Sequence, residues 1–263
     1  MHSKNIKISV VTIVFNDADH ILATVGSVGS QTARANIEYI VVDGASTDGT
    51  SKLLERQSSD IDIYIREKDS GIYNAMNKGL RAATGDFVIF MNSGDRFSDH
   101  DVVRKVVESI AGKEQLPAMI YGHYRECLGE ERTFGVKPSR QPDKIWYGPV
   151  ASHQSTFYNL AFLKNNNLVY DESFRIAADY RLTLETLVRS RYDALRLDLC
   201  ISDFDISGVS NTNQDQGLRE ANRVRREVLD WGSLRTGLLT GLLLGARYTK
   251  RYLNPLYTFL RNR

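Results

Sequence analysis

The sequence predicts an α/β fold with a mixed, mainly parallel sheet flanked by helices. Strand and helix patterns alternate through the first hundred residues, which is typical of successive βα units with right-handed crossovers. The opening segment Ile6–Phe15 is a nearly continuous apolar run, as in a strand buried on both faces. Polar side chains follow three of the expected strands, at the carboxyl ends where sheets of this kind bind ligands.

Four strands and three helices are expected in the first hundred residues. Tyr39–Val42 has the composition of a second buried strand, and the turn residues Asp43-Gly44 end it. Apolar residues at helical spacing mark the helices between the strands. The expected strands are Ile6–Phe15, Tyr39–Val42, Ile61–Ile65 and Phe87–Met91, and the expected helices are Ala18–Ser30, Thr47–Gln57 and Ile72–Ala83.

The pattern loosens after Asp95, and Arg125–Gly148 is polar and irregular enough to predict a loop region. The other elements expected here are strands at Met119–Tyr124 and Thr156–Tyr158 and helices at Val102–Ile110, Asp179–Arg191 and Gln214–Asp230. We therefore divide the chain into a domain over residues 1–215, with halves at about 1–98 and 99–215, and a helical tail over 216–263.

Composition excludes several classes of protein. The chain has 263 residues, 42% of them apolar, which is enough for a sizeable core. Two cysteines, Cys127 and Cys200, exclude a disulfide scaffold and fit a reducing compartment. No apolar run reaches the ~18 residues of a spanning helix. The N-terminus lacks the cleavage pattern of a signal peptide, so we expect a cytoplasmic protein.

Charge is distributed unevenly along the chain. From Leu218 to Arg263 there are ten basic and three acidic residues, a net of +7, whereas the whole chain has a formal charge of only +2. An acidic body with a basic tail argues against a nucleic-acid binder. It favours a tail that meets an anionic surface.

The turn after the first strand excludes a dinucleotide-binding fold. Such a fold needs a glycine-rich turn there, but the sequence reads Phe15-Asn16-Asp17-Ala18-Asp19. The chain has no G-x-x-x-x-G-K-S/T phosphate-binding loop either. A bound nucleotide would therefore be held by side chains and strand ends.

Four ordered motifs resemble those of family 2 glycosyltransferases, which have the GT-A fold. They are Ser9–Asn16, Val41–Thr50, Gly71–Gly79, and Ala83–Asp86 followed by Phe90–Asp95. The resemblance covers about residues 6–210. It implies a donor half over 1–98, an acceptor half over 99–215, and the inverting transfer of a sugar from a nucleotide-sugar donor.

The resemblance implies a donor site at the strand ends. Asp43 would accept the ring N–H of the base; the alternative is that Asp43 only caps the Gly44 turn. Asp48 would be a weaker member, because it also fits a helix start. The donor-binding residues expected on these grounds are Thr12, Val14, Asn16, Asp43, Asp69, Asn77, Lys78, Ser93, Gly94 and Asp95.

Lys78 and Asp95 are the charged donor-side residues with the clearest chemistry. Many relatives have an arginine where this chain has Met76, so Lys78 would supply that charge to the phosphate or sugar; the alternative is a solvated helical lysine. Asp95 is the one acid of Asn92-Ser93-Gly94-Asp95, where the fold commonly has two. We expect it to hold Mn²⁺ or Mg²⁺ against the diphosphate, the alternative being a helix cap.

An inverting transfer needs a base to take the proton of the acceptor hydroxyl. By resemblance the best match is Asp179. The two apolar residues that precede it, Ala177 and Ala178, would limit the solvation of its carboxyl and favour a raised pKa. The alternatives are an N-cap role for Asp179, and Asp171 or Glu172 as the base. His153 and Gln154 match a mid-chain motif and are expected on the diphosphate or acceptor side; a hydrogen-bonded structural histidine is the alternative.

The tail contains the uncharged, leucine-dominated segment Thr236–Ala246, flanked by arginine and lysine. It is too short to span a bilayer and has the composition of an amphipathic helix lying in a membrane surface. Gly237, Gly241 and Gly245 form a smooth stripe that would also suit a homodimer or packing on the body.

The sequence as a whole predicts an inverting, metal-dependent hexosyltransferase at the inner face of the cell membrane. We expect a UDP-hexose or UDP-N-acetylhexosamine donor, with GDP- and dTDP-sugars open, and a polyprenyl-linked saccharide acceptor in bacterial polysaccharide or lipopolysaccharide synthesis. The alternative is a catalytically reduced nucleotide-sugar-binding or scaffold protein. A sugar-nucleotidyltransferase is disfavoured, because the first strand lacks the glycine-rich, basic loop of that class.

Overall fold

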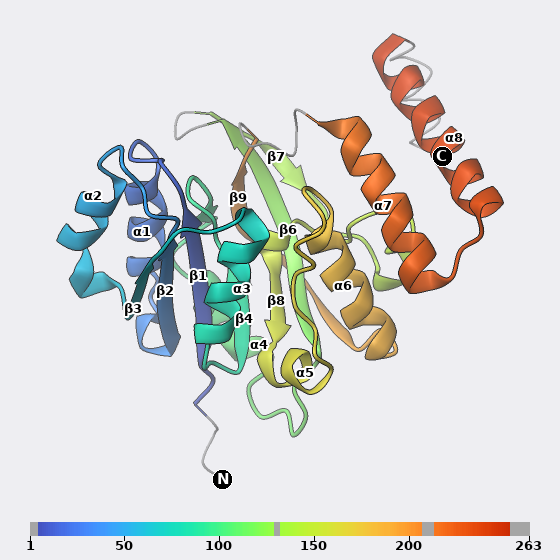
Figure 1. Ribbon diagram of the computed structural model, residues 1–263. Helices are drawn as coiled ribbons and strands as arrows, with labels where there is room; N and C mark the ends of the chain where they lie inside the picture. The colour runs from blue at the N-terminus through green and yellow to red at the C-terminus, as the bar shows by residue number, and fades with distance from the viewer. Residues whose placement is uncertain (1–4, 129–131, 207–212, 253–263) are drawn as a thin grey trace.

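The computed structural model describes residues 5–128, 132–206 and 213–252 (Figure 1). Within this part of the chain, nine strands form one sheet in the order β3-β2-β1-β4-β8-β6-β9-β5, and β7 pairs with β6. The strands are β1 Ile8–Val14, β2 Ile37–Asp43, β3 Ile63–Arg66, β4 Phe87–Phe90, β5 Arg96–Phe97, β6 Met119–Leu128, β7 Arg132–Lys137, β8 Thr156–Asn159 and β9 Ala194–Asp205. The helices are α1 Ile21–Gly29, α2 Thr50–Arg56, α3 Ile72–Ala82, α4 Val102–Ser109, α5 Leu160–Asn165, α6 Ala178–Arg189, α7 Gln214–Leu229 and α8 Ser233–Tyr252.

The sheet is mixed and parallel in its first half, which confirms the predicted fold class. β1 pairs in parallel with β2 and β4, and β2 pairs in parallel with β3. β8 is antiparallel to both of its neighbours, β4 and β6. All seven residues of β1 are buried, as its continuous apolar run requires.

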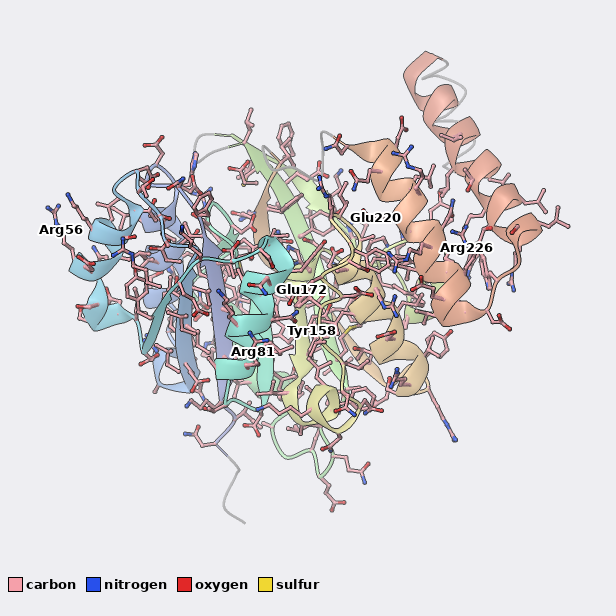
Figure 2. All side chains as sticks on the ribbon, in the orientation of Figure 1. Arg56, Arg81, Tyr158, Glu172, Glu220 and Arg226 are labelled. Atoms are coloured by element: carbon pink, nitrogen blue, oxygen red, sulfur yellow. The ribbon has the colours of Figure 1, made fainter. Side chains whose placement is uncertain are left out.

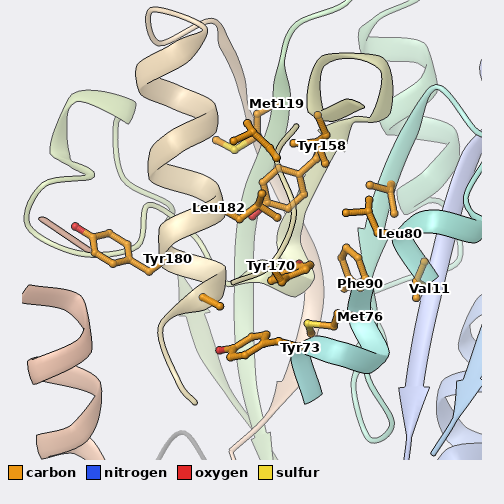
Figure 3. Close-up of a cluster of buried hydrophobic side chains, with 14 of the residues drawn as sticks. Val11, Tyr73, Met76, Leu80, Phe90, Met119, Tyr158, Tyr170, Tyr180 and Leu182 are labelled. Carbon is orange, nitrogen blue, oxygen red and sulfur yellow. The ribbon is translucent and has the colours of Figure 1, made fainter. Parts of the chain in front are cut away.

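Helices cover both faces of the sheet, and each face has its own hydrophobic cluster. Successive residues of β1 point to opposite faces, so Val11 joins the cluster under α3, α5, α6 and α7, whereas Val10 joins the cluster under α1, α2 and α4. Figure 3 shows part of the first cluster, in which the rings of Tyr73 and Tyr170 stack at 5.6 Å and Phe90 meets Tyr170 edge-on.

Several boundaries differ from the prediction. The segment Arg125–Gly148, predicted to be an irregular loop region, contains the end of β6 and the strand β7. The longest strand, β9, was not predicted, and neither were β5 and α5. α1 begins at Ile21 instead of Ala18, and α2 at Thr50 instead of Thr47, because the residues before each helix belong to the loops at the strand ends.

The two C-terminal helices attach to the body through α7. Arg225 of α7 is 1% exposed and donates to the carbonyl oxygens of Trp146 at 2.7 Å and Tyr147 at 3.0 Å. α8 lies outside α7 (Figure 1), and Asn222 of α7 donates to Thr240 of α8 at 2.7 Å. No helix among the described residues has the length and apolar character needed to cross a membrane. The predicted tail, 216–263, extends past the described residues, and its boundary at 215/216 stays a prediction.

Candidate active site

The carboxyl ends of β1, β2 and β4 lie at one edge of the sheet, the upper edge in Figure 1. Parallel pairing brings these ends together, since β1 is hydrogen-bonded to β2 on one side and to β4 on the other. The loops that leave this edge begin at Phe15, Gly44 and Met91. Most of the predicted donor-binding residues therefore lie on or beside one edge.

Asp43 is fully buried at the end of β2, and its carboxylate organises the following loop. It accepts hydrogen bonds from the Ser46 N–H at 2.8 Å, from the Ser51 hydroxyl, and from the Tyr64 hydroxyl at 3.0 Å. Burial opposes its ionisation, but the hydrogen bonds outweigh burial and lower its pKa. Asp43 is thus a buried carboxylate, with the guanidinium of Arg66 3.8 Å away.

The loop after β2 is held from two other segments. Asn16, with a left-handed φ of 49°, accepts from the Thr47 N–H at 2.8 Å, and its own N–H donates to Ser46 at 2.8 Å. Gly44 donates to the carbonyl oxygen of Val14 at 2.9 Å. A Cβ on Gly44 would lie 2.5 Å from the Asp69 carboxylate, so only glycine allows Asp69 to approach the loop this closely.

Thr12 and Asn77, both predicted donor contacts, lie in buried hydrogen-bond networks. Thr12 donates to the Met91 carbonyl at 2.8 Å and pairs with the Tyr39 hydroxyl at 3.0 Å, which ties β1 to its two neighbours. Asn77 of α3 accepts from the Tyr170 N–H and donates to the Tyr170 carbonyl, both at 2.9 Å. Thr12 therefore ties strands within the donor half, whereas Asn77 joins the donor half to the acceptor half, and a direct donor contact stays a prediction for both.

Lys78 is held above the sheet edge by two groups of the preceding loop. Its ammonium donates to the Lys68 carbonyl oxygen at 2.6 Å and lies 3.0 Å from the Glu67 carboxylate. Its side chain is only 11% exposed, which distinguishes it from the solvated lysine considered above. The carbonyl group that Lys78 binds belongs to Lys68, the residue directly before Asp69.

Asp95 follows β4 and is buried beside Asp205, at the end of β9. One carboxylate oxygen of Asp95 accepts from the Asp205 N–H at 3.0 Å and the other from the Gln154 amide at 2.7 Å. Burial, with a contribution from the charge of Asp205, raises the pKa of Asp95 to about 7. Gly94, with φ 91°, also lies close to Asp205: a Cβ there would lie 3.6 Å from the Asp205 carboxylate.

This pair of carboxylates fits part of a divalent-metal shell. Two acids at close range, one with a raised pKa, gain stability from a nearby cation. Among the described residues no three His, Cys, Asp or Glu side chains are grouped to hold a metal by themselves. A cation here would take its other ligands from a diphosphate and water, as Mg²⁺ does when one or two carboxylates hold it.

Among the described residues, three buried polar atoms in the segments next to Asp95 and Gln154 have no hydrogen-bond partner. They are Asn92 Oδ1 and Ser93 Oγ, just after β4, and His153 Nδ1. The turn His153–Ser155 packs against β4, and its Gln154 reaches Asp95. Burial lowers the pKa of His153 to about 4, so its ring is neutral at pH 7. Unpaired buried polar atoms are rare, and a ligand is one of the partners that satisfies them.

Asp179 lies in the first turn of α6, on the acceptor side. One of its oxygens accepts from the Tyr180 N–H at 2.7 Å. Burial raises the pKa of Asp179 to about 6, and the charge of Glu220 adds to the effect. The two alanines before Asp179, predicted to limit its solvation, are both buried: Ala177 and Ala178.

In the two other candidates for the role of base, Asp171 and Glu172, the pKa is shifted in the opposite direction. Glu172, labelled in Figure 2, accepts from Asn77 and from Asn74, each at 2.9 Å, and these amides lower its pKa. Asp171 accepts from Ser173 and lies 3.2 Å from Arg181, and its pKa is also lowered. Of the three carboxyls, Asp179 alone has the raised pKa of a stronger base.

Two acids beside the site were missed by sequence reasoning, Asp205 and Glu220. Asp205 lies on β9, whose mixture of charged and apolar residues hid the strand. Glu220 lies in α7, a helix that was predicted, but nothing in its spacing indicates that it binds the segment before α6. Only the tertiary packing brings either residue to the site.

Comparison with known proteins agrees with this architecture. The family model for glycosyl transferase family 2 matches residues 9–176. An uncharacterized glycosyltransferase of Mycobacterium tuberculosis (strain CDC 1551 / Oshkosh) is 34% identical over 204 residues, which cover 78% of this chain and 77% of the relative. A PGL/p-HBAD biosynthesis glycosyltransferase of Mycobacterium bovis (strain BCG / Pasteur 1173P2) is 24% identical over 212 residues, covering 79% and 80%.

Solved structures share the fold. S. aureus TarS 1–349 in complex with UDP-GlcNAc has a TM-score of 0.67 at 19% identity, covering 93% of this chain and 73% of that one. The mannosyltransferase PcManGT from Pyrobaculum calidifontis, in complex with GDP-Man and Mn²⁺, has a TM-score of 0.65 at 17% identity, covering 87% and 65%. The predicted GT-A architecture is confirmed, and the family match over residues 9–176 shows that the chain belongs to glycosyltransferase family 2.

Proposed function

We propose that this protein is an inverting glycosyltransferase that moves a hexose or N-acetylhexosamine from a nucleotide-sugar, foremost a UDP-sugar, to a saccharide acceptor. The observation that carries the proposal is the contrast among the acceptor-side carboxyls, where Asp179 has a raised pKa and Asp171 and Glu172 have lowered ones. A weakly acidic carboxyl at the junction of the two halves suits a general base. The complexes of TarS with UDP-GlcNAc and of PcManGT with GDP-Man support the donor class.

The donor would lie along the sheet edge from Asp43 to Asp95. The buried Asp43 carboxylate would accept the ring N–H of the base, beside Asn16. The phosphates would reach Lys78 and the unpaired hydroxyl of Ser93. His153 and Gln154 would border the diphosphate and the acceptor, since Gln154 already reaches Asp95.

Asp95 and Asp205 would hold Mn²⁺ or Mg²⁺ against the diphosphate. A divalent cation there supplies positive charge that stabilises the departing nucleoside diphosphate. The Mn²⁺ in the PcManGT complex supports this assignment. Gln154 and the Asp205 N–H hold the Asp95 carboxylate in place for that role.

Asp179 would take the proton of the acceptor hydroxyl as its oxygen attacks the anomeric carbon. The new glycosidic bond forms on the face opposite the leaving group while the bond to the diphosphate breaks, so the configuration inverts. The proton remains on the Asp179 carboxyl until it passes to water. Protein groups around this carboxyl limit its solvation and keep it a competent base at neutral pH.

The acceptor would be a lipid-linked saccharide, and α8 would hold the enzyme at the inner face of the cell membrane. Leu234, Leu238 and Leu242 are 80%, 64% and 71% exposed on one face of α8. With Gly237, Gly241 and Gly245 they line a shallow apolar groove on the side away from α7. No acidic residue follows Asp230, whereas six basic residues do, so this surface suits an anionic bilayer. A second copy of the chain is the competing occupant.

A donor panel tests the proposal. The protein is titrated calorimetrically with UDP-GlcNAc, UDP-glucose, GDP-mannose and a dTDP-hexose, with and without Mn²⁺, and release of the nucleoside diphosphate is followed for each. Asp179→Asn is expected to retain donor binding and to lose turnover by about 10²-fold or more. Asp171→Asn and Glu172→Gln are matched variants, and a larger loss in either would move the base to that residue.

The same panel decides the second candidate function, a nucleotide-sugar-binding scaffold. This candidate is favoured by one observation: the turn after β4 carries a single acid whose two oxygens already bind protein donors. Donor binding without turnover by the wild-type protein, with lipid-linked acceptor present, would support the scaffold. Turnover that depends on Asp179 would exclude it.

A further inference from the structure

Glu220 of α7 binds the backbone just before α6 (Figure 2). Its carboxylate accepts hydrogen bonds from three consecutive N–H groups: Arg175 at 3.2 Å, Ile176 at 2.8 Å and Ala177 at 3.0 Å. Gln216, one turn earlier on α7, donates to the other oxygen of the same carboxylate at 2.9 Å. The two segments are 43 to 45 residues apart in sequence, so this contact is tertiary.

The contact holds the chain where it enters α6. The first N–H groups of a helix have no partner within the helix, and Ser, Thr, Asp or Asn at the N-cap usually satisfies one of them. The N-cap of α6 is Ala177, which makes no side-chain cap. Glu220 instead supplies a carboxylate from α7 to the N–H of the N-cap residue Ala177 and to the two N–H groups before it, at the end of α6 where the helix dipole also favours negative charge. Gly217 of α7 lies next to this segment, since a Cβ there would lie 3.4 Å from the Ile176 side chain, an ordinary van der Waals contact.

The segment that Glu220 binds sets the position of Asp179. Ala177 lies two residues before Asp179, and the short side chain of Asp179 has little freedom apart from its backbone. We propose that Glu220 is a positioning residue for the general base: it fixes the start of α6 so that the Asp179 carboxyl faces the acceptor. This inference rests on the proposed role of Asp179 and adds a function for α7.

The charge of Glu220 gives the arrangement a second consequence. The groups that face Asp179 are Tyr73 from α3, Tyr158 from β8, Tyr170 from the loop before α6, and Glu220 from α7 (Figure 3 shows the three tyrosines). Burial raises the pKa of all three tyrosines, so they are neutral at pH 7. Glu220 stays ionised, because the N–H groups that it accepts from outweigh its burial. Its negative charge disfavours a second charge on Asp179.

Two substitutions separate the geometric from the electrostatic effect. Glu220→Ala removes the acceptor, and kcat is expected to fall about tenfold or more with the donor KM unchanged, because small misplacements of reacting groups cost up to 10²-fold. Glu220→Gln retains an amide oxygen for the N–H groups but removes the charge. It is expected to recover most of kcat at high pH and to shift the acidic limb of the kcat profile to lower pH. Glu227→Gln is the matched control on the same helix, because Glu227 pairs with Arg181 and Arg223 and not with residues 175–177.

Amide hydrogen exchange tests the contact without any substrate. Exchange at Ile176 and Ala177 should be faster in Glu220→Ala than in wild type and in Glu227→Gln. Unchanged exchange would overturn the contact. The positioning role would be overturned if Glu220→Ala has the wild-type kcat and Glu220→Gln has both the wild-type kcat and an unshifted acidic limb. If Glu220→Ala does not fold, the pH profile of Glu220→Gln decides alone. Full activity in Asp179→Asn would instead overturn the proposed base, which separates the two failures.

Discussion

Asp43→Ala should unfold more easily than the wild-type protein as well as lose the nucleotide. The buried carboxylate accepts from Ser46, Ser51 and Tyr64, and alanine leaves all three donors without it. The Ser51 hydroxyl has a second acceptor, the Ser46 carbonyl at 3.3 Å, and the half-buried Tyr64 hydroxyl can turn to water. The buried Ser46 N–H keeps the full cost of an unmade bond, about 1–3 kcal/mol. With about 1 kcal/mol for the other two donors, the loss is about 3 kcal/mol.

Urea unfolding and thermal melting measure this loss. For a chain of this size, about 3 kcal/mol lowers the Tm by about 6–12 °C. Asp43→Asn retains an oxygen for the Ser46 N–H and should lose about 1 kcal/mol, so it stays folded for binding studies. Glu55→Ala, an exposed carboxylate on α2, is the matched control and should melt like wild type.

The nucleotide-binding part of the prediction is tested with Asp43→Asn, the variant expected to stay folded. If Asp43 accepts the ring N–H of the base, Asp43→Asn should weaken UDP binding by about tenfold, which corresponds to about 1.4 kcal/mol. A UDP Kd within twofold of wild type would refute the donor role and leave Asp43 as the organiser of its loop. An unchanged urea midpoint in Asp43→Ala would refute the hydrogen-bond account itself.

Three further outcomes are expected. Since a base must be ionised, kcat should be low below the pKa of Asp179, about 6, and level off about one unit above it; a profile flat from pH 5 to 8 would contradict the assignment. Turnover should be lost in excess EDTA and restored by Mn²⁺, and Asp95→Ala should lose Mn²⁺-dependent UDP binding while keeping its fold by circular dichroism; full activity in EDTA would remove the metal from the mechanism. Liposomes with anionic lipid should sediment the full-length protein, less at high salt, but not a chain ending at Asp230. Equal sedimentation of both forms would refute the membrane surface, and a dimer of the full-length form alone would assign α8 to a second copy.

The sequence predicted the first half of the sheet well, because strands that are buried on both faces have continuous runs of apolar residues. β9 escaped prediction because most of its residues are only half-buried and charged residues such as Arg196 and Asp198 interrupt it. Its partner strand β6 is distant in sequence, so no local turn signals the pairing. Sequence patterns indicate local burial, whereas β9 is stabilised mainly by pairing with a strand that is distant in sequence.

For the candidate site, too, some features could be predicted from the sequence and others could not. Strand-end positions such as Asp43 and Asp95 followed from the alternation of elements, since the carboxyl ends of parallel strands share an edge. The alanines before Asp179 predicted its raised pKa, but the lowered pKa of Glu172 could not be predicted, because it depends on the amides of α3. Motif matching also cannot separate a residue that touches a ligand from one that supports the site, as the buried networks of Thr12 and Asn77 illustrate.

The contact between the Asp95 carboxylate and the Asp205 N–H joins residues 110 positions apart. During synthesis the N-terminal half, with Asp43 and the parallel strands, emerges well before β9 does. A nascent chain that ends before residue 205 therefore has the strand ends with Asp43 and Asp95 but lacks the second acid beside Asp95. If Asp95 and Asp205 hold the metal as proposed, metal-dependent affinity for the donor would arise only when the last strand has joined the sheet.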